Sequence, residues 1–234
     1  MGTSSKVLLV PWDPDSVAHR DYLLRQREEC GWQQDKVENV WREAQTRGEK
    51  CIYWIVIVKV LPSDDSQTVD SNTSKEKSTL QDTAVAINAV PREPTQKSFI
   101  PVGHISLDNG NPDAAKIDLG LPTEGVFWIK TFYVSQSIQG QGIGRAAMDE
   151  VEDMATREPI NAKILMLDTV QKDDQRRNEH AKANHGGAPK VTNEEWYSRR
   201  GYRLIKTVQN YYPVADEDSE ARGTRAVFMR RDIS

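Results

Sequence analysis

A glycine-rich turn is the most informative part of this chain. Its sequence is Gln139-Gly140-Gln141-Gly142-Ile143-Gly144. It follows a run of bulky residues at 126–134 that predicts a strand, and it opens an apolar pattern that predicts a helix. Glycine permits positive φ and places no Cβ between backbone and ligand, while the free N–H groups of a helix N-terminus attract an anion. We therefore expect a ligand that carries a pyrophosphate.

The spacing of the glycines separates the known classes of pyrophosphate site. A dinucleotide-binding fold needs Gly-x-Gly-x-x-Gly, and counted from Gly140 the third glycine is replaced by Arg145. Counted from Gly142 the motif ends at Ala147, a tolerated variant, but the chain lacks the repeated strand–helix alternation of such a domain. That interpretation remains a rival. A Walker loop is excluded, because no Lys followed by Ser or Thr comes after the glycines.

The remaining pattern is Gln/Arg-x-x-Gly-x-Gly/Ala, which Gln139, Gly142 and Gly144 satisfy after Phe132-Tyr133-Val134. It resembles the acetyl-CoA-binding motif of the GNAT family of N-acetyltransferases. A second segment, Trp196-Tyr197-Ser198-Arg199-Arg200-Gly201-Tyr202, is similar to that family's aromatic-Tyr-x-x-x-Gly-aromatic segment. Two motifs in the family's order are more specific than either one alone.

The resemblance extends over about residues 50–231 and implies an acetyl-CoA-dependent N-acetyltransferase, in which a primary amine attacks the thioester directly. The backbone of the strand would bind the pantetheine chain as an added strand, and the loop amides would hold the pyrophosphate with Arg145 nearby. The residues that the resemblance assigns to the cofactor are Phe132, Tyr133, Val134, Gln139, Gly140, Gln141, Gly142, Ile143, Gly144 and Arg145.

Tyr197 matches the family tyrosine that protonates the departing CoA thiolate, a role that suits a phenol with a reference pKa of about 10. The general base stays open, because the chain has Trp128 and Lys130 where many relatives carry a carboxylate or a histidine. His104 and Glu124 are the candidates. The missing base also leaves a second function open, an acyl-CoA-binding regulatory or interaction module without transfer activity.

The acceptor is an amine on a small molecule or a protein. The resemblance places the acceptor groove between the first two helices and the loop 211–213. Trp32, Trp41, Tyr211 and Tyr212 either line a pocket for an aromatic amine or belong to the core.

Composition is typical of a folded intracellular enzyme. The 234 residues are 37% hydrophobic, which predicts one acetyltransferase domain over 1–234. A net charge of −4 argues against a nucleic-acid partner and mildly favours cationic acceptors. Cys30 and Cys51 lack metal-ligand spacing, so we expect reduced thiols, no metal, and a cytoplasmic or nuclear location. The longest apolar run, 51–60, is too short to cross a membrane.

The predicted elements give an α/β or α+β fold. The resemblance implies a mixed, mostly antiparallel sheet with a splayed parallel strand pair and helices on both faces. Strands are expected at 6–10, 51–58, 99–107, 126–135, 163–169, 202–210 and 224–231, and helices at 17–30, 35–46 and from 143, with a short helix capped by Thr192-Asn193-Glu194-Glu195. Two polar segments, 61–97 and 171–190, predict flexible insertions, the second near the acceptor entrance.

Overall fold

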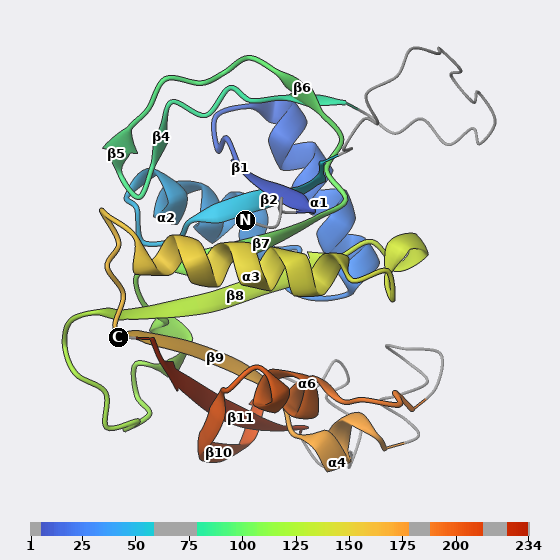
Figure 1. Cartoon of the computed structure of the whole chain (residues 1–234), viewed down its shortest axis with the longest axis vertical. Coiled ribbons are helices and arrows are strands. Elements are labelled where there is room, and N and C mark those ends of the chain that lie inside the picture. Colours follow the sequence, from blue (N-terminus) through green and yellow to red (C-terminus); the bar gives the residue numbers. More distant parts are fainter. Residues whose placement is uncertain (1–5, 59–78, 178–187, 213–223, 234) are drawn as a thin grey trace, which may run out of the picture. The chain divides into compact units, whose positions relative to one another are not determined.

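The structure is a computed structural model that describes residues 6–58, 79–177, 188–212 and 224–233 (Figure 1). Seven strands form one sheet in the order β1-β2-β7-β8-β9-β11-β10, and two small two-stranded sheets accompany it. β8 and β9 pair in parallel, whereas the pairs β1–β2, β2–β7, β9–β11 and β10–β11 are antiparallel. This mixed sheet with helices confirms the predicted fold class.

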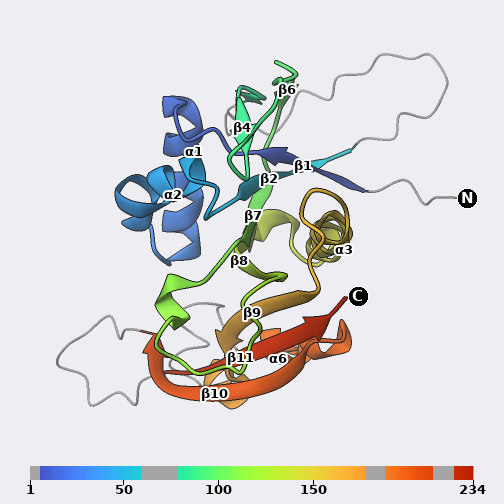
Figure 2. The same ribbon diagram turned by 90° about the vertical axis from the view of Figure 1, so that its left-hand side faces the viewer.

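The chain divides into two compact units, which are described separately. The first unit comprises Met1–Ser106 and Thr131–Asp153, and the second comprises Leu107–Lys130 and Met154–Ser234. The first unit contains α1 and α2 on one side of its strands and α3 on the other (Figure 2). Its main elements are β1 (Val7–Pro11), α1 (Val17–Cys30), the π-helical turn η1 (Val37–Trp41), α2 (Arg42–Thr46), β2 (Ile52–Ile57), β7 (Gly103–Asp108), the end of β8 (Val126–Val134) and α3 (Ile143–Thr156).

Local signals set the bounds of α1 as the sequence predicted. The Ser16 side chain caps the helix by accepting from the His19 N–H, and Gly31 ends it in the left-handed region, at φ 76°. β2 lies between β1 and β7, and residues 52–55 are buried. A continuous apolar run therefore became a central strand.

The second helix differs from the single helix predicted at 35–46. Its first part is a π-helical turn, closed by the Arg42 N–H bonding to the Val37 carbonyl five residues earlier. The wider turn moves the buried face by one residue, so Val37 and Trp41 are buried while Val40 is 49% exposed. The helix predicted at 35–46 is therefore divided, and Val40 lies outside its buried face.

Residues 79–97, within the insertion predicted at 61–97, form short strands in the first unit. They carry β3 (Leu80–Gln81), β4 (Ala86–Ile87) and β5 (Val90–Pro91), and β3 pairs with β6 (Ser98–Phe99). Leu80 and Phe99 join a core cluster with Trp12, Leu23, Trp41 and Trp54. The rest of the predicted insertion, 61–78, lies outside the described residues.

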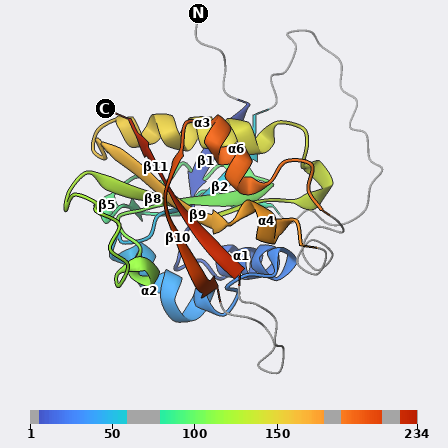
Figure 3. The ribbon, with the colours of Figure 1, turned by 90° about the horizontal axis from the view of Figure 1, so that it is seen from below.

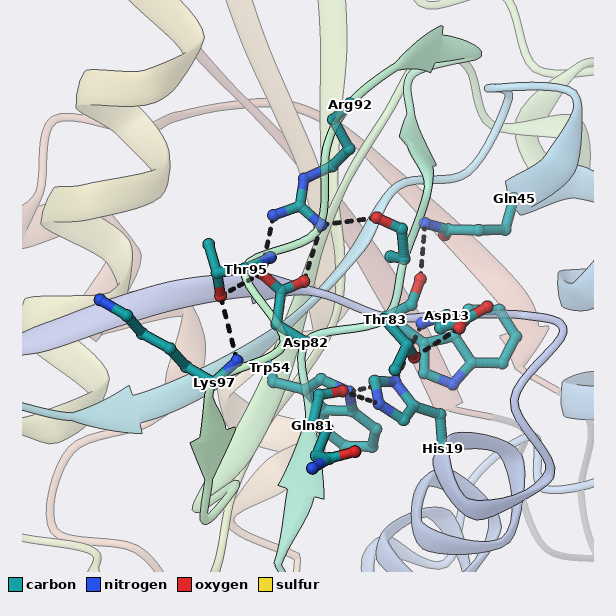
Figure 4. Close-up of polar contacts among 12 residues, drawn as sticks. Asp13, His19, Gln45, Trp54, Gln81, Asp82, Thr83, Arg92, Thr95 and Lys97 are labelled. Atoms are coloured by element: carbon teal, nitrogen blue, oxygen red, sulfur yellow. Dashed lines mark hydrogen bonds and ion pairs between the residues drawn. The ribbon is translucent and has the colours of Figure 1, made fainter.

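Polar side chains hold this segment in place. Asp82 is 4% exposed and accepts hydrogen bonds from both terminal nitrogens of Arg92, at 2.7 and 2.8 Å, and from the N–H and hydroxyl of Thr95 (Figure 4). His19 Nε2 donates to the Gln81 carbonyl at 2.9 Å, while its Nδ1 accepts from Trp54. The segment satisfies its own buried polar groups.

The second unit is built on the antiparallel strands β9, β11 and β10 (Figure 3). Its elements are η2 (Pro112–Ala114), the start of β8, β9 (Ile164–Val170), α4 (Lys172–Gln175), α6 (Asn193–Arg199), β10 (Arg203–Tyr212) and β11 (Thr224–Asp232). Trp128, Met166 and Phe228 centre its apolar core. α4 falls at the start of the insertion predicted at 171–190, of which 178–187 lie outside the described residues.

The parallel pair β8–β9 has a short register. It joins Val126 to Ile164, Phe127 to Leu165 and Trp128 to Met166, although β8 continues to Val134 and β9 to Val170. A short register between two longer parallel strands agrees with the predicted splayed pair.

Candidate functional site

The predicted glycine loop connects β8 to α3 within the first unit. After the 3₁₀ turn η3 (Gln136–Ile138), Gly140 and Gly142 adopt φ values of 79° and 83°, which favour glycine. A Cβ built on either residue would meet nothing within 4 Å, and residues 139–142 are exposed. The backbone of this loop is open to a ligand.

The start of α3 provides hydrogen-bond donors beside the loop. The first bond of the helix runs from the Ala146 N–H to the Gly142 carbonyl at 3.1 Å, so the preceding amides have no acceptor within the helix. Ile143 and Ala147 are buried and fix the helix to the sheet, while Arg145 is exposed in the first turn. The donors, the positive end of the helix and this cation fit a pyrophosphate.

Two further contacts shape the same loop. The ideal Cβ of Gly144 would lie 3.4 Å from the ring of Phe132, so a glycine lets α3 approach β8 closely. The Gln139 side chain donates to the Val134 carbonyl at 2.8 Å and ties the loop to the end of the strand. The side chain of Gln139 therefore serves the loop itself, and its backbone N–H donates to the Gln136 carbonyl at 3.3 Å.

Tyr197 belongs to the second unit, on the short helix α6. The predicted capping box is confirmed: the Thr192 side chain accepts from the Glu195 N–H, and the Glu195 carboxylate accepts from the Thr192 N–H. The ring of Tyr197 makes edge contacts with Trp196 at 5.0 Å and with Tyr202 at 5.9 Å between centroids. These contacts orient a half-buried phenol.

Residues that the sequence analysis did not identify hold α6 in place. Gln175 of α4 accepts from the Asn193 N–H at 2.8 Å, and Arg176 donates to both Glu195 oxygens at 2.8 Å. The Thr192 backbone N–H, followed by Arg176, lowers the pKa of Glu195 to about 2. The charged composition of 171–177 was the only available signal, and it did not specify these contacts.

The structure also decides between roles for His104. This residue is fully buried, and its Nε2 accepts from Arg27 Nη1 at 3.4 Å, so its Nδ1–H donates to Gln26 Oε1 at 2.7 Å. Burial, followed by the charges of Arg27 and Lys50, lowers the pKa of His104 well below its usual value. A buried histidine whose lone pair is occupied is unsuited to act as a general base.

Lys130 is held by polar side chains in the second unit. Its Nζ lies 2.7 Å from Asp168 Oδ1 and 3.3 Å from Asn111 Oδ1. The Tyr212 hydroxyl donates to Asp168 Oδ2 at 2.7 Å, and Tyr211 packs on Phe228. Burial, then Asp168, raises the pKa of Tyr212 well above its usual value.

The structure shows where the aromatic residues lie that could either line an amine pocket or belong to the core. Trp41 is 5% exposed and belongs to the core of the first unit, and Tyr212 is fixed by Asp168. Trp32 is half-buried and accepts a hydrogen bond from Arg27 through its carbonyl. Pro213, the third residue of the predicted acceptor loop, lies outside the described residues.

Glu124, the other candidate base, is exposed beside a pocket of about 620 Å³ in the second unit. The pocket lies at the start of β8, and none of the predicted cofactor-binding residues lines it. Its lining residues are Asn109, Leu121, Pro122, Thr123, Glu124, Gly125, Val126, Phe127, Trp128, Ile160, Asn161 and Lys163.

The described part of the chain offers neither a metal site nor a membrane span. No group of three or more His, Cys, Asp or Glu side chains there could hold a metal ion. None of the described helices is long and apolar enough to cross a membrane.

Comparison with known proteins identifies the family of the chain. The model of the acetyltransferase (GNAT) family matches residues 67–185, about half of the chain. No curated protein matches the chain.

Solved structures share the fold at low identity. Arabidopsis thaliana NAA60 with a bisubstrate analogue aligns with a TM-score of 0.54 and 12% identity, covering 97% of this chain and 99% of that one. Its complex with acetyl-CoA gives 0.52 and 11%, covering 97% and 98%. Mutant forms of the spermidine/spermine N-acetyltransferase SpeG from Vibrio cholerae give 0.53 and 10%, covering 98% and 95%.

Proposed function

The chain belongs to the acetyltransferase (GNAT) family, and from this premise we propose that it transfers the acetyl group of acetyl-CoA to a primary amine. The observation that carries the proposal is the loop at Gly140 and Gly142, whose open, positive-φ backbone precedes the N-terminus of α3. Two similar structures contain acetyl-CoA or a bisubstrate analogue, which supports the same cofactor here.

Each part of the cofactor has a proposed partner. The pyrophosphate binds the amides of residues 140–144, with Arg145 as the cation of the first helical turn. The pantetheine chain hydrogen-bonds the backbone of 132–134 as an added strand. When bound, acetyl-CoA supplies the activated thioester, and the protein supplies orientation and charge stabilisation.

The reaction needs one proton acceptor and one proton donor. The neutral amine attacks the thioester carbonyl, a C–N bond forms, the C–S bond breaks, and CoA leaves as a thiolate. We propose that the Tyr197 hydroxyl protonates this thiolate and regains a proton from solvent. The attacking amine releases its own proton to water, because His104 is buried with its lone pair occupied.

A second candidate function is an acyl-CoA-binding module without transfer. This function is favoured because two residues considered for the general base already have partners. His104 accepts a hydrogen bond from Arg27, and Lys130 is paired with Asp168. The two functions predict different outcomes once acetyl-CoA is bound. Only the transferase releases a free thiol when an amine is added.

The test is a screen of acceptors with free-thiol detection, covering amino acids, peptides, arylalkylamines, aminoglycosides and polyamines. Amine-dependent thiol release together with a heat of acetyl-CoA binding would support the transferase. Binding heat without thiol release for any class would favour the binding module, and absence of binding heat at millimolar acetyl-CoA would refute both.

We further propose that residues 1–234 act as one acetyltransferase domain, because the family match at 67–185 includes parts of both compact units. A cytoplasmic or nuclear location is proposed on the basis of Cys30 and Cys51, which are both free thiols.

A further inference from the structure

A cluster of polar side chains is buried beneath α1 and η1 in the first unit. We call it the polar cluster. It consists of Gln26 (4% exposed), Arg27 (3%), Lys50 (7%), His104 (0%) and Ser106 (0%). Burial of polar groups at this density is costly unless they are paired, and burial of charge is costlier. The cluster therefore requires an explanation beyond packing.

Arg27 is the member whose charge is not balanced. Its Nε donates to the Trp32 carbonyl at 2.8 Å, and its Nη1 donates to His104 at 3.4 Å. Within the described residues it forms no ion pair, and its Nη2 takes part in neither hydrogen bond. Burial lowers the pKa of Arg27, but a guanidinium remains charged in proteins.

Trp41 brings a second cation to the same place. The guanidinium of Arg27 lies 5.4 Å from the Trp41 ring centroid, and Lys50 Nζ lies 4.7 Å from it. Trp41 ends the π-helical turn η1, a feature that is frequent at functional sites. One aromatic ring therefore positions two positive charges.

The two cations also act on the neighbouring His104. Arg27 and Lys50 both lower the pKa of His104, after the larger effect of burial, so His104 is neutral at an electropositive position. The Tyr133 hydroxyl, on a residue 7% exposed, lies close to the exposed Glu29. Burial first, then Glu29, raises the pKa of Tyr133, so the phenol is neutral.

The strand beside the cluster is strained. Thr131 of β8 adopts a φ of 45°, a conformation that β-branched residues rarely adopt. Its hydroxyl donates to Ser106 Oγ at 2.8 Å, and Lys50 Nζ donates to the same oxygen at 3.2 Å. Such strain costs about 1–3 kcal/mol and is concentrated at ligand sites.

We propose that the polar cluster is an anion-recognition site, in which Arg27 binds a small carboxylate. A carboxylate matches the planar donor fork of a guanidinium, and it would neutralise the charge of Arg27. Two sources share this chemistry. In the first, which rests on the proposed function, the carboxylate belongs to the acceptor amine. In the second it is a free small carboxylate.

The proposal also selects among acceptors. An electropositive cluster favours amines that carry their own carboxylate, such as an amino acid, and repels polyamines. This local charge opposes the cationic preference inferred from the net charge of −4. The chemistry of the buried residues is the stronger guide, since net charge affects encounter rates more than it defines a site.

The first experiment measures binding without turnover. Thermal unfolding of the full chain is followed with propionate, with β-alanine and with ethylamine at constant ionic strength. A specific carboxylate raises the melting temperature, because it binds only the native state, and ethylamine does not. If neither carboxylate, at about 50 mM, shifts the melting temperature or the His104 imidazole NMR signals, the proposal is overturned.

The second experiment uses Arg27→Met, Arg27→Lys and the control Arg25→Met. Arg25 lies on the same helix but is exposed over Tyr22. Arg27→Met should weaken carboxylate binding about 10- to 100-fold, with partial rescue in Arg27→Lys and no change in Arg25→Met. Without ligand, Arg27→Met should melt no lower than wild type, since it removes a buried unpaired charge. Destabilisation with unchanged binding would assign Arg27 a structural role and refute the site.

The third experiment separates the two sources. Amines with and without a carboxylate, β-alanine and ethylamine, are compared as acceptors. If the acceptor supplies the anion, β-alanine is acetylated and Arg27→Met raises its KM about 10- to 100-fold. If a free carboxylate fills the site, β-alanine gains no advantage, and the melting shift by propionate persists. A failure of all acetyl transfer would refute the proposed function, while the propionate shift would still report on the anion site.

Discussion

Lys130 Nζ lies 2.7 Å from Asp168 Oδ1, two residues beyond the last backbone pair between β8 and β9. The register ends at Trp128 and Met166, and the next residues on the same face of each strand are joined through their side chains. Both side chains are largely buried, at 16% and 7% exposure. An ion pair thus continues the connection between two parallel strands after the hydrogen-bond ladder ends.

Replacing one residue of this ion pair should lower the free energy of unfolding more than replacing both. Asp168→Asn leaves Lys130 without its counter-charge, and we expect a loss of about 2–4 kcal/mol in the free energy of unfolding. The double variant Lys130→Met, Asp168→Leu should recover part of that loss. Urea unfolding of the wild type, both single variants and the double variant measures the coupling. An Asp168→Asn protein as stable as wild type would show that the pair does not hold the strands.

The Asp82–Arg92 contact predicts a change of stability in acid. Arg92, the largest favourable contributor, and then Thr95 lower the pKa of Asp82 to about 2, against about 3.9 in an unfolded chain. Because the folded-state pKa is the lower one, this contribution is complete above about pH 4 and is lost as the pH falls toward 2.

The corresponding variant is Asp82→Asn. It should be less stable than wild type by about 2 kcal/mol at pH 7 and should approach wild type near pH 2. Urea midpoints measured from pH 2 to pH 7 test this. Parallel curves for the two proteins, with a constant offset across the range, would contradict the assigned role of Asp82.

The glycine loop allows a test with a matched control. Gly142 (φ 83°) and Gly120 (φ 59°) both adopt positive φ, and a Cβ on either would meet nothing within 4 Å. Valine at each position should therefore cause similar backbone strain of about 1–2 kcal/mol. Only Gly142→Val should weaken acetyl-CoA binding, because its side chain would enter the proposed pyrophosphate site. Equal affinities in the two variants, measured by calorimetry, would exclude the loop from the cofactor site.

Local signals in the sequence were enough to define most elements. Ser16 and Gly31 fixed both ends of α1, and the Thr192–Glu195 capping box fixed the start of α6, because each depends on bonds between near neighbours in the chain. The spacing of the glycines likewise identified the loop before α3, and Gly140 and Gly142 adopt positive φ there. The proposed cofactor-binding loop could be predicted because it would bind its ligand through backbone amides.

Features that depend on distant partners were not predictable. Asp82 is buried because Arg92 and Thr95 return to it, and α4 docks on α6 through Gln175 and Arg176, contacts that no local pattern encodes. His104 was a candidate base in the sequence, and only its burial next to Arg27 excludes it. Side chains that act across the fold require the structure.

The most direct test compares the amine-dependent release of CoA by the wild type and by Tyr197→Phe. The variant keeps the ring contacts with Trp196 and Tyr202 and loses only the hydroxyl. We expect wild type to release CoA only when an acceptor amine is present. Tyr197→Phe should lower kcat about 10²- to 10⁴-fold, with an unchanged acetyl-CoA Kd and melting temperature. Wild-type kcat in the variant, or a wild-type protein that binds acetyl-CoA and acetylates no amine, would contradict the account.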